Sequence, residues 1–322
     1  MKVVLPGGSG ELGRLLTNAF AAEGYDVIVL SRAADGEATG SARRVLWDGE
    51  SVGAWAAELE GADAVVNLAG RSVNCRYTPA NRREILDSRV KSTEAVGAAI
   101  ARCVEPPRVW LQSSTATIYA HRYDAPNDER RGRLGGEEEG VPETWRFSIE
   151  VARAWERALE GADTPRTRKV ALRTAVVMST DRGGAFDVLL GLVRRGLGGT
   201  SGNGRQYVSW IHHVDFARAV LWLVDNELSG AVNLAAPGPL PNAEFMRDLR
   251  RAWGARIGLP ATRWMLEVGA VFLRTETELV LKSRFVVPAR LTEAGFTFVH
   301  PSWPEAARDL CTEWRLETAR GR

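Results

Sequence analysis

The chain has 322 residues, of which 45% are hydrophobic and 25% charged, and these proportions are ordinary for a globular protein. Its net charge of +2 gives no electrostatic reason to expect nucleic acid or a membrane surface as a partner, and no apolar run reaches the length of a membrane span. Three widely spaced cysteines, Cys75, Cys103 and Cys311, indicate neither a disulfide framework nor a zinc site, so we expect a cytoplasmic protein without a metal.

A glycine-rich turn near the start of the chain is its most informative stretch. Residues 3–5 predict a strand, the segment from Gly7 to Gly13 predicts a tight turn, and the apolar spacing from Leu12 onward predicts a helix. Such a turn aims backbone N–H groups and a helix N-terminus at one point, which suits a pyrophosphate. A turn without a ligand is the alternative. The expected cofactor-binding residues are Gly7, Ser9, Gly10, Glu11, Leu12 and Gly13, although Glu11 brings a negative charge close to the expected phosphates.

The second predicted strand, residues 26–30, ends in Ser31 and Arg32. A dinucleotide site that prefers NAD usually has Asp or Glu here to hold the ribose 2′-hydroxyl. Arg32 instead offers a planar fork of donors for a 2′-phosphate, so we predict NADP as the cofactor. A surface arginine in a loop is the alternative. A third strand over residues 44–47 is followed by Asp48, which we place in the cofactor site together with Ser31.

Residues 64–67 predict a fourth strand, which runs into the small-residue turn Leu68-Ala69-Gly70. A backbone of small residues can run close beside a cofactor, so these three residues join the expected site. A long helix predicted over residues 79–103 carries Arg89. This arginine could reach the cofactor or pair with a carboxylate such as Asp87 or Asp128.

A fifth strand is predicted over residues 109–112, continuing into Ser113, Ser114 and Thr115. A helix over residues 145–159 and a sixth strand over 170–177 follow. Strands that alternate with helices predict an α/β fold, a doubly wound parallel Rossmann sheet. We expect Ser113 and Ser114 below the nicotinamide; a strand end that only satisfies its own backbone is the alternative.

The alternation of strands and helices loosens after residue 178. We therefore predict an NADP-binding Rossmann domain over residues 1–177 and a smaller C-terminal substrate lobe over 178–322, with the short strand 231–235 as a candidate to rejoin the main sheet. The candidate substrate-binding residues are His121, Arg205, Gln206, Trp210 and His212. A packed histidine is the alternative for His212, and a solvated loop for Arg205 and Gln206. Because His212 and His213 are adjacent in a predicted strand, we expect them to face opposite sides.

Several segments together resemble one family. They are the glycine turn, residues 67–70, 88–90, 114–119 and 209–212, and Arg290-Leu291 followed by Gly295-Phe296. In these segments the chain resembles the atypical branch of the extended short-chain dehydrogenase/reductases, whose members are named as nucleoside-diphosphate-sugar epimerases and carry a short C-terminal domain of unknown function. The resemblance runs from about residue 3 to about residue 310. It implies a Rossmann domain, NADP binding and a substrate lobe, but no particular substrate.

The resemblance also implies catalytic residues, of which one pair is missing. In the wider superfamily a Ser or Thr after the fifth strand hydrogen-bonds the substrate oxygen, and Thr115 matches this position when Tyr119 is aligned with the tyrosine that ends the motif. The superfamily's acid/base Tyr, and its Lys four residues later, would fall at Ser148 and Ala152. We therefore predict that Thr115 orients the substrate and that Tyr119 supplies the proton, with His121 or His212 as substitutes. A core tyrosine with a satisfied hydroxyl is the other interpretation of Tyr119.

These residues together predict an NADP(H)-dependent oxidoreductase or epimerase that acts on a small polar molecule such as a sugar. Because the Tyr-Lys pair is missing, a non-catalytic NADP(H)-binding sensor or scaffold is the alternative. A lyase or dehydratase that uses the cofactor transiently is a third hypothesis. We expect neither a nucleic acid nor a membrane as partner, and the sequence does not predict the oligomeric state.

Overall fold

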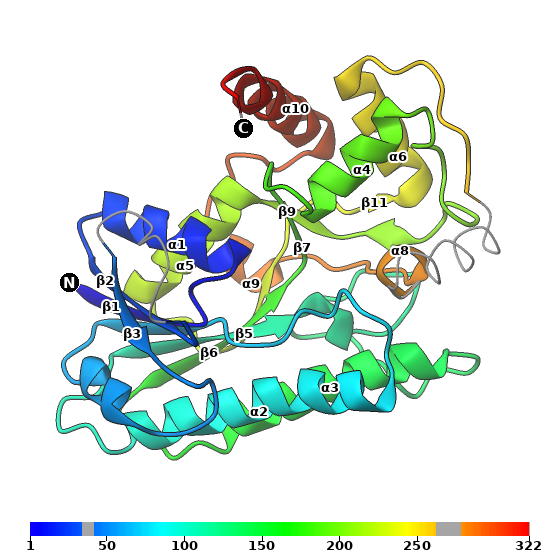
Figure 1. Cartoon of the computed structure of the whole chain (residues 1–322). Coiled ribbons are helices and arrows are strands. Elements are labelled where there is room, and N and C mark those ends of the chain that lie inside the picture. Colours follow the sequence, from blue (N-terminus) through cyan, green and yellow to red (C-terminus); the bar gives the residue numbers. More distant parts are fainter. Residues whose placement is uncertain (34–41, 262–277, 322) are drawn as a thin grey trace.

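The computed structural model describes residues 1–33, 42–261 and 278–321, and a sheet of seven parallel strands lies at its centre (Figure 1). The order β10-β6-β5-β4-β1-β2-β3 reverses direction beside β1, so the sheet is wound in both directions from its middle. This arrangement confirms the predicted Rossmann-like α/β fold. The strands are β1 (Lys2–Pro6), β2 (Asp26–Ser31), β3 (Arg43–Leu46), β4 (Ala64–Asn67), β5 (Val109–Thr115), β6 (Arg168–Thr174) and β10 (Gly230–Leu234).

Helices cover both faces of the sheet, because alternate residues of a strand point to opposite sides. In β1, Val3 and Leu5 pack with Leu16 of α1 (Glu11–Ala22) and with α5 (His213–Asp225). Val4, between them, packs on the other face with Val96 of α2 (Pro79–Ile100). Helix α3 (Glu143–Glu160) lies beside α2 on that second face (Figure 1). No helix in the described ranges is long and apolar enough to cross a membrane.

The predicted sixth strand is divided in two, which corrects the expectation of one strand over 170–177. β6 ends at Thr174, and the backbone N–H of Ala175 then donates to the carbonyl of Leu234. After this point the chain leaves the main sheet, and β7 (Val176–Met178) pairs with β9 (Trp210–His212) in a small parallel sheet. The change of partner bends the chain away from the main sheet toward the C-terminal part.

Residues after 178 contribute to the main sheet as well as to a second core. Strand β10 pairs in parallel with β6, so the segment 231–235 does rejoin the main sheet. The second core packs helices α4 (Ala185–Arg194), α6 (Asn242–Trp253) and α10 (Trp303–Ala319) together around Phe186, Phe245 and Trp303. The division at residue 177 stays a prediction. The remaining elements are η1 (Ala54–Leu59), η2 (Ala116–Ile118), β8 (Tyr207–Val208), β11 (Leu240–Pro241), α8 (Glu278–Leu281) and α9 (Ala289–Glu293).

Candidate cofactor and active site

The three fingerprint glycines between β1 and α1 are required for different reasons. Gly7 has φ of +75°, and a Cβ there would lie 2.7 Å from the backbone of Ala69. A Cβ on Gly13 would lie 2.2 Å from the carbonyl oxygen of Gly8, so this glycine lets the helix pack against the turn. A Cβ on Gly10 would meet only the carbonyl oxygen of Gly7, at 3.8 Å. The protein itself therefore does not require a glycine at position 10, and the open space fits the approach of a phosphate.

Gly13→Ala should destabilise the fold, because its methyl group must displace the backbone of Gly8. Overpacking of this kind costs about 1–3 kcal/mol. Urea unfolding followed by circular dichroism measures the change in the free energy of unfolding. Gly10→Ala is the matched control, since its methyl group enters open space at a φ of −76°. Equal losses of stability in the two variants would contradict this division of roles.

The N-terminus of α1 opens at the glycine turn and has no side-chain cap. Gly10 is the N-cap residue, so the first N–H groups of the helix, which include those of Glu11 and Leu12, have no side-chain acceptor. Such a helix end attracts an anion. The carboxylate of Glu11 accepts a hydrogen bond of 2.9 Å from the Ser179 hydroxyl and does not line the pocket beside the turn. Its negative charge is therefore directed toward the loop after β7.

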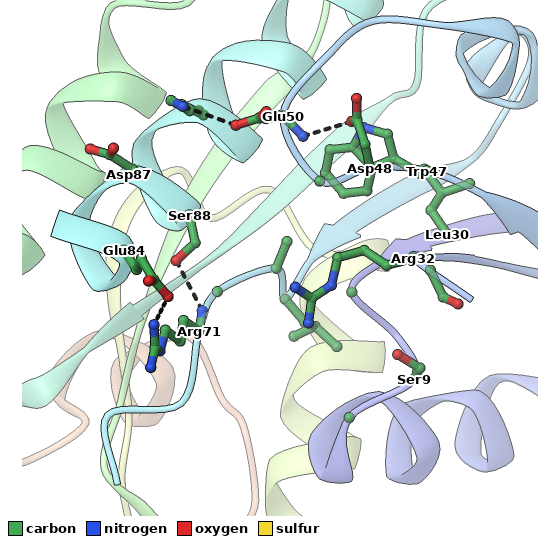
Figure 2. Close-up of a pocket in the computed structure, with 18 residues that line it drawn as sticks. Ser9, Leu30, Arg32, Trp47, Asp48, Glu50, Arg71, Glu84, Asp87 and Ser88 are labelled. Carbon is green, nitrogen blue, oxygen red and sulfur yellow. Dashed lines mark hydrogen bonds and ion pairs between the residues drawn. The ribbon is translucent and has the colours of Figure 1, made fainter. Parts of the chain in front are cut away.

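A pocket of about 600 Å³ lies along the carboxyl ends of β1, β2 and β4 (Figure 2). It brings together nine of the predicted cofactor residues, which are Gly7, Ser9, Gly10, Ser31, Arg32, Asp48, Leu68, Ala69 and Gly70. The other six predicted residues do not line it; they are Glu11, Leu12, Gly13, Arg89, Ser113 and Ser114. The sequence analysis missed the far wall, formed by Glu84, Asp87, Ser88 and Lys91 of α2. Their spacing is one polar stripe of a helix, which was a detectable signal.

Most charged side chains in this pocket have a partner, and Arg32 and Asp87 are the exceptions among the described residues. Lys91 bonds to Glu50 at 2.9 Å, and Arg71 pairs with Glu84. Arg32 points into the pocket (Figure 2) and makes no hydrogen bond or ion pair with the described part of the chain. The pocket therefore holds an arginine fork that is available to an anionic ligand.

Asp48 organises the loop beside the pocket. Its carboxylate accepts hydrogen bonds of 2.9 Å from the backbone N–H groups of Glu50 and Ser51, and it also bonds to the Ser51 hydroxyl. The Ser51 hydroxyl and these N–H groups lower the pKa of Asp48. The carboxylate therefore stays ionised while it holds the loop that carries Glu50.

Arg89 supports the site from behind. Its guanidinium donates to the carbonyl oxygens of Arg71 and Ile85, at 2.9 and 3.0 Å, and lies over the ring of Trp155. Burial lowers the pKa of Arg89 to about 10. Neither Asp87 nor Asp128, its two predicted partners, is bonded to it in the described structure. Arg89 is thus a positioning residue for the turn that follows β4.

The end of β5 separates its three hydroxyl side chains. The Ser114 hydroxyl is buried and donates to Glu156 at 2.6 Å, and Glu156 in turn pairs with Arg173. Ser113 and Thr115 point to the opposite face and are half-buried. Thr115 accepts a long hydrogen bond of 3.2 Å from the N–H of Thr117. Of the three, Ser114 therefore belongs to the core rather than to a ligand site.

The position of Tyr119 does not suit the proton donor that the sequence predicted. The side chain is only 2% exposed. Its hydroxyl donates to Asn233 at 2.9 Å and accepts from Arg173 at the same distance. Burial raises the pKa of Tyr119. The structure thus supports the other interpretation, a core tyrosine whose hydroxyl is satisfied.

A second polar cluster, which the sequence analysis missed, surrounds Ser148 of α3. The Ser148 hydroxyl bonds to Glu278 of α8 and lies 3.4 Å from the Tyr77 hydroxyl. Tyr77 comes from the loop before α2, and the three residues meet only in the folded chain. Because Tyr77 is not followed by Lys four residues later, no local motif marked it.

Two buried cations complete this cluster. Lys282 donates to the carbonyl oxygen of Thr117 at 2.7 Å and lies 3.7 Å from the Glu278 carboxylate. The guanidinium of Arg284 bonds to the Thr117 hydroxyl at 3.2 Å. Burial lowers the pKa of Lys282 to about 8 and raises that of Glu278. A buried cluster of titratable groups with shifted pKa values is typical of an active site.

A further pocket of about 590 Å³ lies beside this cluster, between the loop after η2 and the C-terminal part. Its walls include the predicted residues His121 and Gln206 together with Tyr123 and Trp145. Lys282 and Arg284 lower the pKa of His121, although burial is the larger cause. The structure therefore brings two of the five predicted substrate residues into one pocket.

The other three predicted substrate residues lie outside that pocket. The guanidinium of Arg205 lies over the ring of Tyr123, which is a wall residue of the pocket, 5.8 Å from the ring centre. Trp210 is fully buried and packs edge-on against Trp303. His212 is also fully buried and lines neither pocket. His213 begins α5 instead of continuing the strand, so the two adjacent rings lie 4.5 Å apart and do not face opposite sides as expected.

The sheet order, the glycine turn and the pocket at the carboxyl ends of the strands define a nucleotide-binding Rossmann protein. Residues 3–235 match the NAD dependent epimerase/dehydratase family, and residues 261–310 match a domain of unknown function, DUF1731. The chain belongs to the NAD dependent epimerase/dehydratase family.

Named relatives match the chain over nearly its full length. The human epimerase family protein SDR39U1 is 30% identical over 316 residues, which cover 96% of this chain and 99% of the relative. Epimerase family protein Mb2239 of Mycobacterium bovis is 32% identical over 308 residues, covering 94% and 95%. Both matches extend across the Rossmann part and the C-terminal part.

Solved structures show the same fold. The crystal structure of human SDR39U1 (isoform2) with NADPH superposes with a TM-score of 0.83 at 29% identity, covering 97% of this chain and 99% of that one. A nucleoside-diphosphate sugar epimerase from Corynebacterium glutamicum gives a TM-score of 0.75 at 27% identity, covering 99% of this chain and 60% of that one.

Proposed function

We propose that the protein is an NADP(H)-dependent oxidoreductase or epimerase that acts on a small polar molecule such as a sugar. The cofactor proposal rests on the pocket at the glycine turn, where the open space at Gly10 and an Arg32 without a partner among the described residues face each other. The similar human protein was crystallised with NADPH, which agrees with this choice. When bound, the cofactor would supply a hydride donor or acceptor.

The NADP preference is attributed to Arg32, which would bind the 2′-phosphate as a planar donor fork. A charge-assisted hydrogen bond contributes about 1.5–3 kcal/mol, so Arg32→Ala should weaken NADPH binding roughly tenfold to a hundredfold. NADH affinity should stay nearly unchanged. Titration calorimetry with both cofactors measures the two dissociation constants. Equal losses for NADPH and NADH would overturn the assignment.

For the chemical step, we assign the substrate oxygen to Thr115 and the proton to Tyr77. Thr115 lies on the half-buried face at the end of β5. The Tyr77 hydroxyl lies 3.4 Å from the Ser148 hydroxyl, which stands where the superfamily's tyrosine is expected. The phenol of Tyr77, which comes from the loop before α2, would thus take the place of the tyrosine that α3 lacks.

Arg284 supports this assignment electrostatically, and Glu278 supports it by positioning Ser148. Burial lowers the pKa of Arg284, whereas attraction to Glu278 and to Tyr77 acts in the opposite direction. A guanidinium near a phenol stabilises the phenolate form, which is the role of the absent Lys in the superfamily. Glu278 bonds to Ser148 and so fixes the hydroxyl beside Tyr77.

The substrate would occupy the pocket beside this cluster. Its wall contains Trp145 and Tyr123, which offer flat apolar faces, and Gln206 and His121, which offer polar atoms. Aromatic faces with a few fixed polar groups suit a sugar-like molecule. Arg205 at the rim would favour an anionic substituent.

A non-catalytic NADP(H)-binding sensor or scaffold is the second candidate, because Ser148 and Ala152 replace the expected Tyr-Lys pair. Convergent polar groups around Ser148 favour the enzyme, since an inert protein has no need of a buried cluster there. Single-turnover hydride transfer separates the two: carbonyl compounds are tested as oxidants of bound NADPH, and nucleotide sugars as reductants of bound NADP+. Hydride transfer with any member of either panel supports the enzyme. If every member leaves the bound cofactor unchanged, the binding protein is favoured.

A further inference from the structure

Three of the four histidines in the chain meet at one place, where His300 joins the adjacent His212 and His213 from about 90 residues away. His212 ends β9, His213 begins α5, and His300 lies in the loop before α10. Two carboxylates of α10, Asp309 and Glu313, complete the group. None of the five residues lines either of the pockets described above. The group therefore has no part in the proposed reaction.

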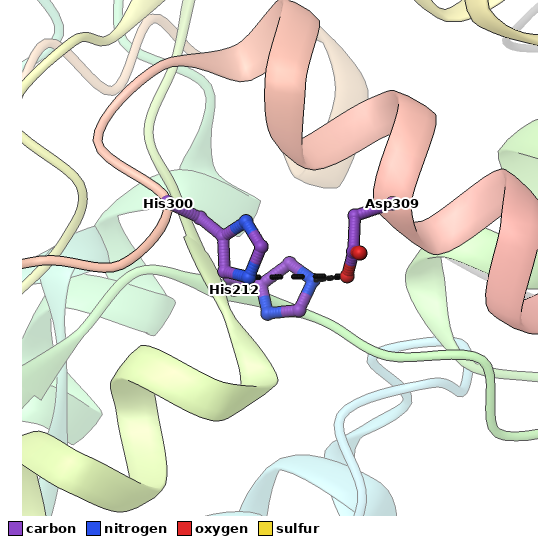
Figure 3. A group of neighbouring side chains, drawn as sticks. All are labelled: His212, His300 and Asp309. Atoms are coloured by element: carbon purple, nitrogen blue, oxygen red, sulfur yellow. Dashed lines mark ion pairs between the residues drawn. The ribbon is translucent and has the colours of Figure 1, made fainter.

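His212 is the residue that requires an explanation. Its side chain is 0% exposed, and its Nε2 has no hydrogen-bond partner among the described residues. A buried polar atom without a partner is costly and uncommon. Nε2 points toward the Oδ2 of Asp309 at 3.4 Å, which is longer than an ordinary hydrogen bond (Figure 3). The Nε2 of His300 lies 3.8 Å from the same oxygen.

These separations resemble the edges of a coordination tetrahedron. Ligand atoms about 2.0–2.1 Å from a tetrahedral zinc ion lie about 3.3 Å from one another. The two nitrogen-to-oxygen distances are 3.4 and 3.8 Å. The rings of His212 and His300 stack with centroids 3.8 Å apart, so the His300 ring must rotate before both nitrogens can face one cation. Two imidazoles and one carboxylate are ligands typical of zinc and similar divalent metals.

We propose that His212, His300 and Asp309 bind a divalent transition-metal cation of the zinc class. His300 and Asp309 have side chains that are 15% and 44% exposed, so a cation can enter from solvent and water can complete the coordination. The bound ion would fasten α10 to the junction of β9 and α5.

The neighbouring pair His213 and Glu313 is excluded from the ligand set. Their side chains already bond to each other at 3.0 Å, so neither lacks a partner. His212 must also give up an existing contact, because its Nδ1 accepts a bond of 3.3 Å from the N–H of Val214. With Nδ1 as acceptor, the neutral ring carries its proton on Nε2; when a cation binds at Nε2, the proton moves to Nδ1, which can then no longer accept from Val214. The lost bond is long, and a metal–nitrogen bond is much stronger.

The alternative is a weak contact between His212 and Asp309 with no ion, and metal titration distinguishes the two. Protein treated with a chelator and then dialysed is titrated with zinc sulfate in a calorimeter, and its thermal unfolding is recorded with and without zinc. We expect one zinc ion per chain and a higher midpoint of unfolding with zinc. No stoichiometric binding would overturn the proposal.

Variants locate the site. His300→Ala and Asp309→Asn change partly exposed positions and should fold, which circular dichroism checks; each should weaken zinc binding roughly a hundredfold or more. Glu305→Gln, one turn earlier on α10, is the matched control and should keep the affinity. Zinc binding that is unchanged in both variants would contradict the proposal. Loss of binding in His213→Asn but not in His300→Ala would assign the ion to the neighbouring pair and also overturn it.

Discussion

Gly10→Val should abolish NADPH binding while the protein stays folded. The backbone at Gly10 has φ of −76° and ψ of 178°, a conformation that valine adopts readily, and a Cβ there meets no atom closer than 3.8 Å. The branched side chain would instead fill the space in front of the helix N-terminus, where the phosphates are expected. Losing two or more charge-assisted hydrogen bonds corresponds to a loss of affinity of at least about a hundredfold.

Calorimetric titration with NADPH measures this loss, and circular dichroism checks that the variant is folded. Gly10→Ala is the graded control, because its single methyl group intrudes less and should weaken binding to a smaller degree. Gly13→Ala tests the opposite case, a glycine needed by the fold itself. Normal NADPH affinity in folded Gly10→Val would show that the phosphates bind elsewhere.

Most of the predicted cofactor residues lie together, because they follow strands along the chain. Each parallel strand ends at the same edge of the sheet, so Gly10, Arg32, Asp48 and Gly70 were expected together and do line one pocket. Two predicted residues outside the pocket, Arg89 and Ser114, are held by other parts of the chain. Arg89 bonds to backbone carbonyls and Ser114 bonds to Glu156, and neither partner is visible from local spacing.

The proposed catalytic residues around Ser148 could not be predicted in the same way. Glu278, Lys282 and Arg284 reach Ser148 and Thr117 from more than 100 residues away in the chain, so no motif joins them. The histidine group has the same origin, since His212 and His300 meet only when α10 packs against β9. The burial of Tyr119 could not be foreseen, because a strand-end position does not reveal which hydroxyls the core will use. The Tyr119 hydroxyl bonds to Asn233 of β10 and to Arg173 of β6.

Two variants, Tyr77→Phe and Tyr119→Phe, test which of the two tyrosines supplies the proton. Tyr77→Phe keeps the ring that packs edge-on against Phe147 and removes only the hydroxyl beside Ser148. If Tyr77 supplies the proton, single-turnover hydride transfer to a substrate found in the panel should slow by about 10²–10⁴-fold. NADPH affinity should stay within a few-fold, because Tyr77 does not line the cofactor pocket.

Tyr119→Phe is the matched control, and its expected result is the reverse. Removing that hydroxyl leaves the buried Oδ1 of Asn233 and Nη1 of Arg173 without the partner they have in Tyr119, so the free energy of unfolding should fall by about 1–3 kcal/mol. Hydride transfer should continue at nearly the normal rate at temperatures where the variant is folded. A slow step in Tyr119→Phe together with a normal rate in Tyr77→Phe would restore Tyr119 as the donor. Normal rates in both variants would exclude both phenols and leave His121, in the adjacent pocket, as the side chain to test next.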